Sequence, residues 1–377
     1  MSASALVLRM RTVLVSHGLK LAVAACLAAV VGTACVFAVG NHSSVTITML
    51  RMNSPRHFHT STPLTDGRVL IAGGDELGTA ELFDPSTSSF KGLGKMTHVR
   101  MAAMAVLLMD GRVLIAGGDS IGSAELFDPK TETFMPTGSM DQLHRGGTMT
   151  LLADGKVLVA GGSVDSGDHS SAMAELYDPV AGSFAVTGSM RQPRLDFTAT
   201  LVPNLGVLVV GGHSAGITNF GLMPTDTAEI YDPSSGTFRL AANLGEARWQ
   251  HTATLLHDGG VLIAGGCNAT QLTPGVNSAE RFDPATGKFS AITWPAHEGC
   301  DETASLLPDG KVFLLSGLVV LLYDDASASF TGLDIRSWPD RRQQTLLADG
   351  RVLVSGGDTG DNHNPATDEA AIYTLPS

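Results

Sequence analysis

The stretch DGRVLIAGG at residues 66–74 recurs letter for letter at residues 110–118. Five further copies follow with substitutions: DGKVLVAGG from residue 154, LGVLVVGG from 205, DGGVLIAGG from 258, DGKVFLLSG from 309 and DGRVLVSGG from 349. Counting Ser316 in the sixth copy, the first motif glycines are 44, 44, 50, 54, 51 and 40 residues apart. A repeat of this length is typical of a β-propeller or a solenoid. We therefore expect one large repeat domain.

Each copy is expected to form four strands. In the second copy these are MAVLL from residue 104, VLIAGG from 113, AELFDP from 124 and TFMPTGSM from 133. Asp-Gly between the first two is a strong hairpin signal, because glycine accepts the positive φ of a tight turn. VLIAGG is apolar at successive positions, so both faces of that strand must be covered. The pattern predicts an all-β, seven-bladed β-propeller of four-stranded antiparallel blades.

Features that recur in most of the copies carry a family resemblance. A Gly-Gly pair and a loop precede a sequence such as Glu-Leu-Tyr-Asp-Pro at residues 175–179, and an aromatic residue follows. This arrangement resembles the kelch repeat, although Phe stands here where kelch repeats usually carry Trp. The resemblance implies a β-propeller of four-stranded blades.

The N-terminal part of the repeat region is expected to close the ring. The last copy ends after its third strand, in AAIYTLPS, so it lacks a fourth. Thr46, Met52 and Arg56 have the same spacing as Phe90, Met96 and Arg100 around the fourth strand of the first copy. Residues 46–52 should therefore supply the missing strand.

Residues 1–40 form a segment of a different kind. Arg9, Arg11 and Lys20 precede an uncharged run over residues 21–40. Such a segment is a cleaved signal peptide or an N-terminal membrane anchor, and residues 41–377 form the propeller. Because basic residues stay in the cytoplasm, either case places the propeller outside it, as a secreted, periplasmic or anchored domain.

Charge excludes two classes of partner. The whole chain has a formal charge of −13, and since residues 1–40 hold three basic residues and no acid, the remainder carries −16. Such a surface disfavours nucleic acid and anionic lipid. Any membrane attachment is expected through residues 21–40 only, and we expect a monomer.

One face of the propeller is expected to carry function. The loops after the glycine motifs and the links between blades share a face, here called the looped face; the Asp-Gly turns lie on the other, the hairpin face. Long loops on a rigid scaffold are where binding usually occurs. Four occur on the looped face, at residues 163–173, 213–227, 267–278 and 358–368.

Residues that break the repeat on the looped face are the binding candidates. The start of the innermost strand carries a different residue in each blade: His59, Ala103, Thr148, Phe197, His251, Glu302 and Gln344. The candidates are His59, Phe197, His251, Glu302 and Gln344 from this set, with Trp249, Asp168, His169, Phe220, Asp361 and His363. An arginine that recurs in six blades is expected to be structural: Arg56, Arg100, Arg145, Arg194, Arg248 and Arg341.

Catalytic signals are weak. His59, His251 and Glu302 would suit a divalent metal if the inner strands brought them together, but the sequence does not fix their distances, so no metal or cofactor is assigned. Ser214 lies in a G-x-S-x-G match, yet no helix follows as that motif requires. Kelch propellers similar to galactose oxidase bind copper through tyrosines, one of them cross-linked to a cysteine. All four tyrosines here fall in the third strand of a repeat, which leaves none for such a site: Tyr177, Tyr231, Tyr323 and Tyr373.

Cys267 and Cys300 are the only cysteines beyond residue 40. Both are expected on the looped face in neighbouring blades, so they form either a disulfide or two free thiols. We predict an exported, non-catalytic module that binds a protein or a glycan through the looped face. The alternative is a carbohydrate-active enzyme with an axial acid or metal site on the same face.

Overall fold

The computed structural model describes residues 45–165, 169–215, 222–268, 275–276, 278–295, 300, 302–317, 319–335, 339–359 and 366–375. All belong to the unit Ser43–Ser377. They form thirty strands and, among these residues, no helix. No helix long and apolar enough to cross a membrane therefore occurs in the described part of the chain.

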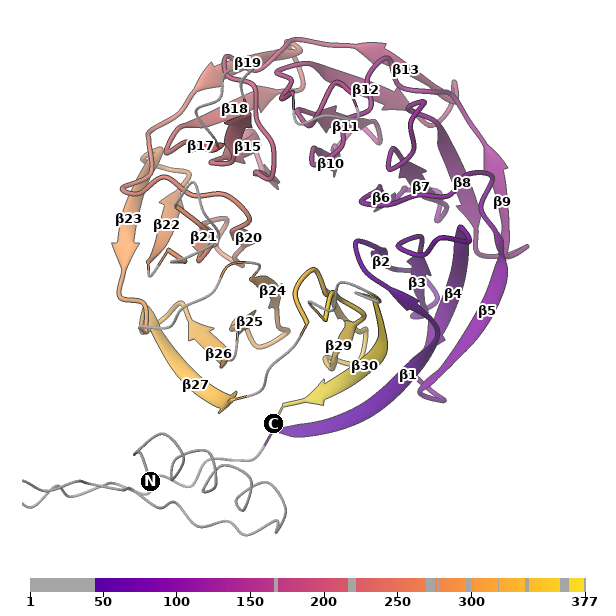
Figure 1. Ribbon diagram of the computed structural model, residues 1–377. Coiled ribbons are helices and arrows are strands. Elements are labelled where there is room, and N and C mark those ends of the chain that lie inside the picture. The colour runs from indigo at the N-terminus through magenta and orange to yellow at the C-terminus, as the bar shows by residue number, and fades with distance from the viewer. Residues whose placement is uncertain are drawn as a thin grey trace, which may run out of the picture. The chain divides into compact units, whose positions relative to one another are not determined.

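Seven four-stranded sheets are arranged as blades in a ring (Figure 1). From the axis outward, blade 1 is β2 (Thr60–Pro63), β3 (Val69–Ala72), β4 (Thr79–Asp84) and β5 (Ser89–Lys95); blade 2 is β6 (Met104–Leu107), β7 (Val113–Ala116), β8 (Ala124–Asp128) and β9 (Thr133–Pro136); blade 3 is β10 (Thr148–Leu151), β11 (Val157–Ala160), β12 (Ala174–Asp178) and β13 (Ser183–Val186). Blade 4 is β14 (Thr198–Val202), β15 (Gly206–Val210), β18 (Ala228–Asp232) and β19 (Thr237–Leu240), with a hairpin of β16 (His213–Ala215) and β17 (Leu222–Pro224). Blade 5 is β20 (Thr252–Leu255), β21 (Val261–Ala264), β22 (Ala279–Asp283) and β23 (Lys288–Ile292); blade 6 is β24 (Thr303–Leu306), β25 (Val312–Ser316), β26 (Val319–Asp324) and β27 (Ser329–Ile335). Blade 7 is β28 (Gln343–Leu346), β29 (Val352–Ser355), β30 (Thr367–Thr374) and β1 (Thr46–Arg56).

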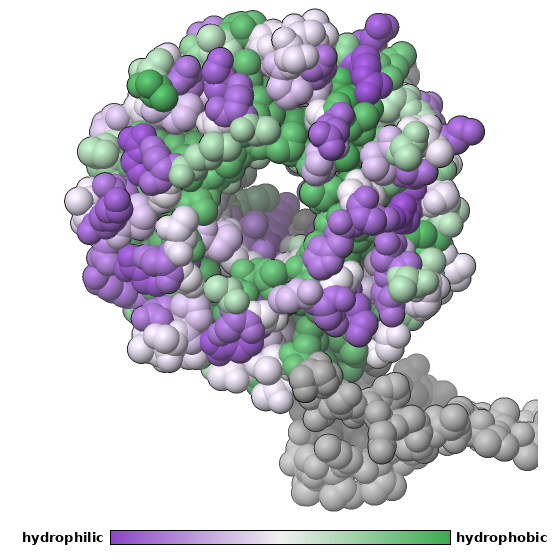
Figure 2. Space-filling view, turned by 180° about the vertical axis from the view of Figure 1, so that it is seen from behind, coloured by the Kyte–Doolittle hydropathy of each residue, from purple (hydrophilic) through white to green (hydrophobic). Residues whose placement is uncertain are grey.

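The predicted ring closure is confirmed. β1 pairs antiparallel with β30, with Thr46 opposite Thr374 and Leu50 opposite Ala370. Each inner strand also contacts the inner strands of both neighbouring blades, including β28 against β2. An opening runs along the axis, and Figure 2 shows apolar residues along much of its edge.

The second strand of every blade is buried on both faces, as its apolar run predicts. In β3, Leu70 and Ala72 pack toward blade 2 beside Val113 and Ile115 of β7. The alternate residues Val69 and Ile71 pack toward blade 7 in a separate cluster. Seven such clusters, one between each pair of neighbouring blades, make up the core.

The paired motif glycines hold the links between blades. A Cβ on Gly74, at φ +72°, would lie 2.5 Å from the carbonyl oxygen of His57 in the link entering its own blade. A Cβ on Gly73 would lie 2.8 Å from the carbonyl oxygen of Arg100, in the link entering the next blade. Glycine is required because two links press on one strand end, and because left-handed backbone disfavours other residues.

Candidate functional site

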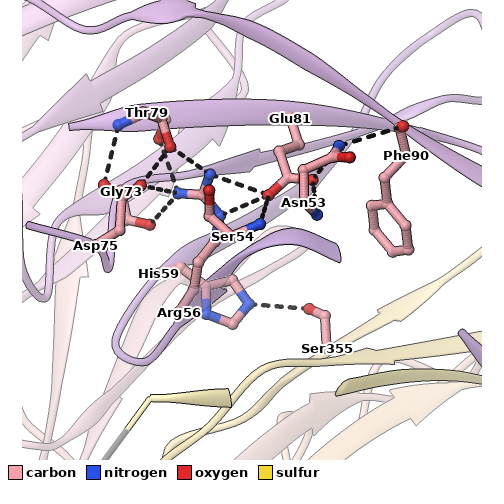
Figure 3. A network of polar contacts seen from close by, with 10 residues as sticks. All are labelled: Asn53, Ser54, Arg56, His59, Gly73, Asp75, Thr79, Glu81, Phe90 and Ser355. Carbon is pink, nitrogen blue, oxygen red and sulfur yellow. Dashed lines mark hydrogen bonds and ion pairs between the residues drawn. The ribbon is translucent and has the colours of Figure 1, made fainter. Parts of the chain in front are cut away.

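The link that enters each of blades 1 to 5 is held by a buried basic residue on the looped face. Arg56 donates from Nη1 to the carbonyl oxygens of Gly73 and Thr79, each at 2.8 Å, and from Nε to Glu81 at 3.1 Å (Figure 3). Glu81 in turn accepts from the backbone N–H of Asn53 at 2.7 Å. The fully buried guanidinium thus joins the link to the second and third strands. The same pairing recurs as Arg100–Glu125, Arg194–Glu229 and Arg248–Glu280.

The expectation for two of the six arginines is wrong. In blade 3 the buried side chain at this position is His144, which contacts Glu175 at 2.9 Å, whereas Arg145 is exposed. In blade 7, counting back seventeen residues from the first motif glycine, the position holds Pro339, and Arg341 follows two residues later. The strand residue aligned with Glu81 is Leu321 in blade 6 and Ala371 in blade 7, so the carboxylate is missing from both blades.

His59 and His251 bridge neighbouring blades. His59 Nε2 lies 2.9 Å from Ser355 Oγ of blade 7 (Figure 3), and His251 Nε2 lies 2.9 Å from Thr198 Oγ1 of blade 4. Burial lowers the pKa of each imidazole to about 3, with a further contribution from the nearby arginines. Both rings are therefore neutral near neutral pH, and both are held between blades instead of facing the channel.

Glu302 and Phe197 also lie between blades. Glu302 accepts from the backbone N–H of Gly266 at 2.7 Å and from Ser316 Oγ at 2.9 Å. In blades 1, 3, 4 and 7 the N–H of the second motif glycine instead donates to an arginine carbonyl oxygen, as Gly74 does to Arg100. Phe197 is buried and packs where a Cβ on Gly161 would be. The described residues contain no group of three His, Cys, Asp or Glu side chains able to hold a metal, so His59, His251 and Glu302 do not converge.

Thr148 begins β10 as expected, but neither Thr148 nor Gln344 takes the position that His59 holds in blade 1. Fourteen residues before the first motif glycine, where His59 stands in blade 1, blade 3 has Gly147 and blade 7 has Arg342. Gln344 lies inside β28, where it accepts from Thr303 Oγ1 and donates to Ser305 Oγ, both at 2.9 Å. Its side chain joins two inner strands.

The remaining candidates are dispersed. Trp249 is buried, and its ring meets that of His213 edge to face at 5.0 Å. His169 is an exposed loop residue, 2.7 Å from Asp165. Cys267 and Cys300 form a disulfide, with Cα atoms 5.3 Å apart, which joins the looped face of blade 5 to the segment entering blade 6. Four candidates lie outside the described residues: Asp168, Phe220, Asp361 and His363.

The sequence reasoning missed the residues at the mouth of the channel. Fifteen residues before the first motif glycine, the link turns through a positive φ in every blade described there: Phe58, Ala102, Gly146, Asp196, Gln250 and Arg341. We call these six the mouth residues. Backbone hydrogen bonds join neighbours, from Ala102 N to Phe58 O at 3.0 Å and from Gln250 N to Asp196 O at 2.9 Å. Constant spacing to the glycine motif is the signal that could have found them.

The mouth residues share one backbone geometry but present different chemistry. Arg341 lies over the Phe58 ring at 4.4 Å and pairs with Asp358 at 2.8 Å. In blade 4, Asp196 lies 3.2 Å from Nε2 of the buried His213. The mouth therefore has an aromatic and cationic side at blades 7 and 1, and an acidic side at blade 4.

A family comparison bears on this geometry. The Kelch motif matches residues 248–293, which begin at the buried Arg248 and run through all four strands of blade 5. The same strand order occurs in all seven blades, and the glycine pair in six of them. The chain is a kelch-repeat β-propeller.

Comparison with solved structures agrees on the fold of this kelch propeller. A fungal alcohol oxidase of the AA5 family, solved in complex with copper, superposes with a TM-score of 0.69 at 17% identity, over 87% of this chain and 76% of that one. At this identity the similarity concerns the fold alone. No curated protein sequence matches the chain.

The tyrosines of the kelch propeller do not fit a copper site built on tyrosine. All four are fully buried in third strands: Tyr177, Tyr231, Tyr323 and Tyr373. The hydroxyls of Tyr177 and Tyr231 bond Thr137 and Thr187 of the preceding blade at 2.8 and 2.9 Å, and that of Tyr323 bonds Asp325 at 3.0 Å. These contacts fix blades and their turns, and Cys267 and Cys300 are committed to each other.

Proposed function

We propose that this kelch propeller is an exported, non-catalytic binding protein that recognises a protein or a glycan through its looped face. The observation that carries the proposal is the mouth of the channel. One backbone conformation recurs there in blade after blade, but the side chains range from Phe58 to Asp196 to Arg341. A constant frame with varied side chains suits recognition of one ligand.

The environment of the disulfide supports export. Cys267 and Cys300 are bridged, and disulfides persist in oxidising compartments and are rare in the cytosol. The basic residues and the uncharged run of residues 1–40 have the sequence pattern of a signal peptide or anchor.

The enzyme alternative rested on His59, His251 and Glu302. Each of the three is buried and hydrogen-bonded to a neighbouring element, and they belong to different blade interfaces. No other observation on the described residues favours catalysis, and fold similarity alone does not supply it.

The test is a ligand screen on the full-length protein with immobilised glycans and extracellular proteins, repeated with Phe58→Asn and Asp196→Asn. Asparagine tolerates the positive φ at both positions, so the backbone is preserved. We expect ligand affinity to fall at least tenfold in one or both variants. Val180→Ser, at an exposed turn of the hairpin face, is the control. A ligand whose affinity is unchanged by both mouth variants but lost in the control would contradict the proposal.

A further inference from the structure

The loops that follow the glycine motifs of blades 1 and 2 are short, and we call this part of the looped face the low sector. Residues 75–78 and 119–122 follow the first two glycine motifs, whereas blade 3 carries residues 163–173 at the same place. The two short loops are built alike. Asp75 bonds the backbone N–H of Thr79 at 3.0 Å, and Asp119 bonds those of Ile121 and Ser123 at 3.1 and 3.3 Å. Hydrogen bonds to its own aspartate therefore stabilise the conformation of each loop.

Large aliphatic side chains stand exposed on this low sector. Leu77 and Ile121 occupy the same loop position and are 60% and 62% exposed. Val99, in the link entering blade 2, is 47% exposed, and a Cβ on Gly78 would lie 3.2 Å from its Cα. Leu77 and Val99 are thus neighbours. Single exposed aliphatics are common, but neighbours at the edge of a cavity mark a contact surface.

A pocket of about 660 Å³ opens beside them, between the links and loops of blades 7, 1 and 2. Its apolar wall is formed by Pro55, Leu77, Val99, Met101 and Ala366. This volume accommodates a large side chain with the residues that flank it.

Charge on the pocket rim is of one sign. Glu76 lines the pocket and is exposed, and among the described residues no cation pairs with it. Asp75 is already engaged, because it bonds Thr79 and lies 3.3 Å from Arg56. His57 completes the polar lining. Burial lowers the pKa of His57, the Asp358 carboxylate opposes this and the Arg341 guanidinium adds to it, so the ring is neutral near neutral pH.

We propose that this pocket binds a partner protein through a segment in which a large apolar side chain is adjacent to a lysine or arginine. The apolar side chain enters between Leu77, Val99 and Met101, and the cation lies over Glu76. Charge complementarity selects this occupant, since the rim carboxylate is unpaired among the described residues and the chain beyond residue 40 carries −16. The inference rests on the proposed function, because it names the partner class and a subsite of the same face.

The experiment selects a phage-displayed random heptapeptide library on the immobilised full-length protein and measures the enriched peptides by calorimetry. We expect enriched sequences with an apolar residue next to Lys or Arg. Leu77→Ser and Glu76→Lys should each weaken binding at least tenfold, and Glu76→Lys should lose more at low salt. Val180→Ser is the matched control, since Val180 is an aliphatic residue 97% exposed on the hairpin face. Melting curves of the variants should coincide, because the substituted side chains are exposed.

Three outcomes would overturn the inference. Enriched peptides lacking basic residues would exclude the charge argument, and self-association of the protein lost in Leu77→Ser would assign the surface to a second copy. Peptide binding that survives both pocket variants but is lost in Phe58→Asn or Asp196→Asn would refute the pocket while leaving the proposed function intact. Failure of the proposed function is separate, and would show as ligand affinity indifferent to every looped-face variant.

Discussion

The imidazole of His144 is enclosed by acceptors, with Nε2 2.9 Å from Glu175 Oε1 and Nδ1 2.5 Å from the carbonyl oxygen of Gly161. A carbonyl only accepts, so Nδ1 carries a proton. Burial raises the pKa of Glu175, but the hydrogen bonds from His144 and from the Asp141 backbone outweigh this and lower it below its usual value. The carboxylate is therefore ionised, and the imidazole of His144 faces it in the place that a guanidinium takes in four other blades.

Removing this imidazole should destabilise the propeller. We expect His144→Ala to lower the free energy of unfolding by about 3 kcal/mol, because the buried Glu175 carboxylate loses its side-chain hydrogen-bond partner. His144→Arg should restore most of the loss, since arginine serves this position in four other blades. Arg145→Ala is the control and should change stability by less than about 0.5 kcal/mol, because Arg145 is exposed. Urea unfolding measures all three, and an Arg145 effect larger than that of His144 would reverse the assignment.

Acid should destabilise the ring through His59 and His251. Their folded-state pKa values are about 3, below the unfolded value of about 6.5. The unfolded chain binds more protons between these values, so stability is present above pH 6.5 and is lost as the pH falls toward 3. Each histidine should contribute a slope of about 1.4 kcal/mol per pH unit within that window. Chemical unfolding from pH 7 to 4 should show a shallower slope for His59→Gln, and again for the double variant with His251→Gln; an unchanged slope would contradict the burial of both rings.

Deleting residues 41–52 should open the ring. The outer edge of β30 would lose its partner along six paired positions, and we expect the unfolding free energy to fall by several kcal/mol. Differential scanning calorimetry against the intact protein measures the effect. A melting temperature that does not change would refute the closure.

The motif glycines allow a matched pair of substitutions. Gly74→Ala should cost about 3 kcal/mol or more, because the new Cβ meets the His57 carbonyl oxygen at 2.5 Å in addition to the strained φ. Gly287→Ala has nearly the same φ, +67°, with nothing within 4 Å, and should cost only about 1 kcal/mol. Equal losses in urea titrations would show that backbone strain alone explains the motif.

Thiol titration of the denatured protein reports on export. With Cys267 and Cys300 bridged, removal of residues 1–40 leaves no free thiol, whereas an uncleaved chain keeps Cys26 and Cys35. We expect zero thiols and a mass matching a chain that starts after residue 40 for a cleaved signal peptide, and two thiols at full mass for an anchor. Two thiols in the shortened chain would contradict the disulfide.

The scaffold was predictable because each blade repeats the same physical requirements, namely a turn glycine, a strand buried on both faces and a glycine pair under two links. The strand at Thr46 followed from spacing for the same reason. The roles of residues near the axis were harder to predict from the sequence. His144 and Arg145 are adjacent, and only burial distinguishes the one that replaces arginine. Gln344 was misplaced because it follows Arg341 by three residues, as His59 follows Arg56, whereas Arg341 is not the equivalent of Arg56. Counting fourteen residues back from Gly356 gives the correct equivalent of His59, which is Arg342. Hydrogen bonds such as that of His59 to Ser355 join residues almost three hundred positions apart, which no local pattern reveals.

The pairing of β1 with β30 also sets the order in which the protein can be completed. β1 is the first strand of the ring to be synthesised, and Thr46 meets Thr374 only when almost the whole chain is present. If the chain crosses a membrane N-terminus first, six blades can assemble in turn on the far side while β1 waits unpaired. A chain interrupted before β30 therefore leaves β1 without its partner, so the ring closes only after all seven blades have been made.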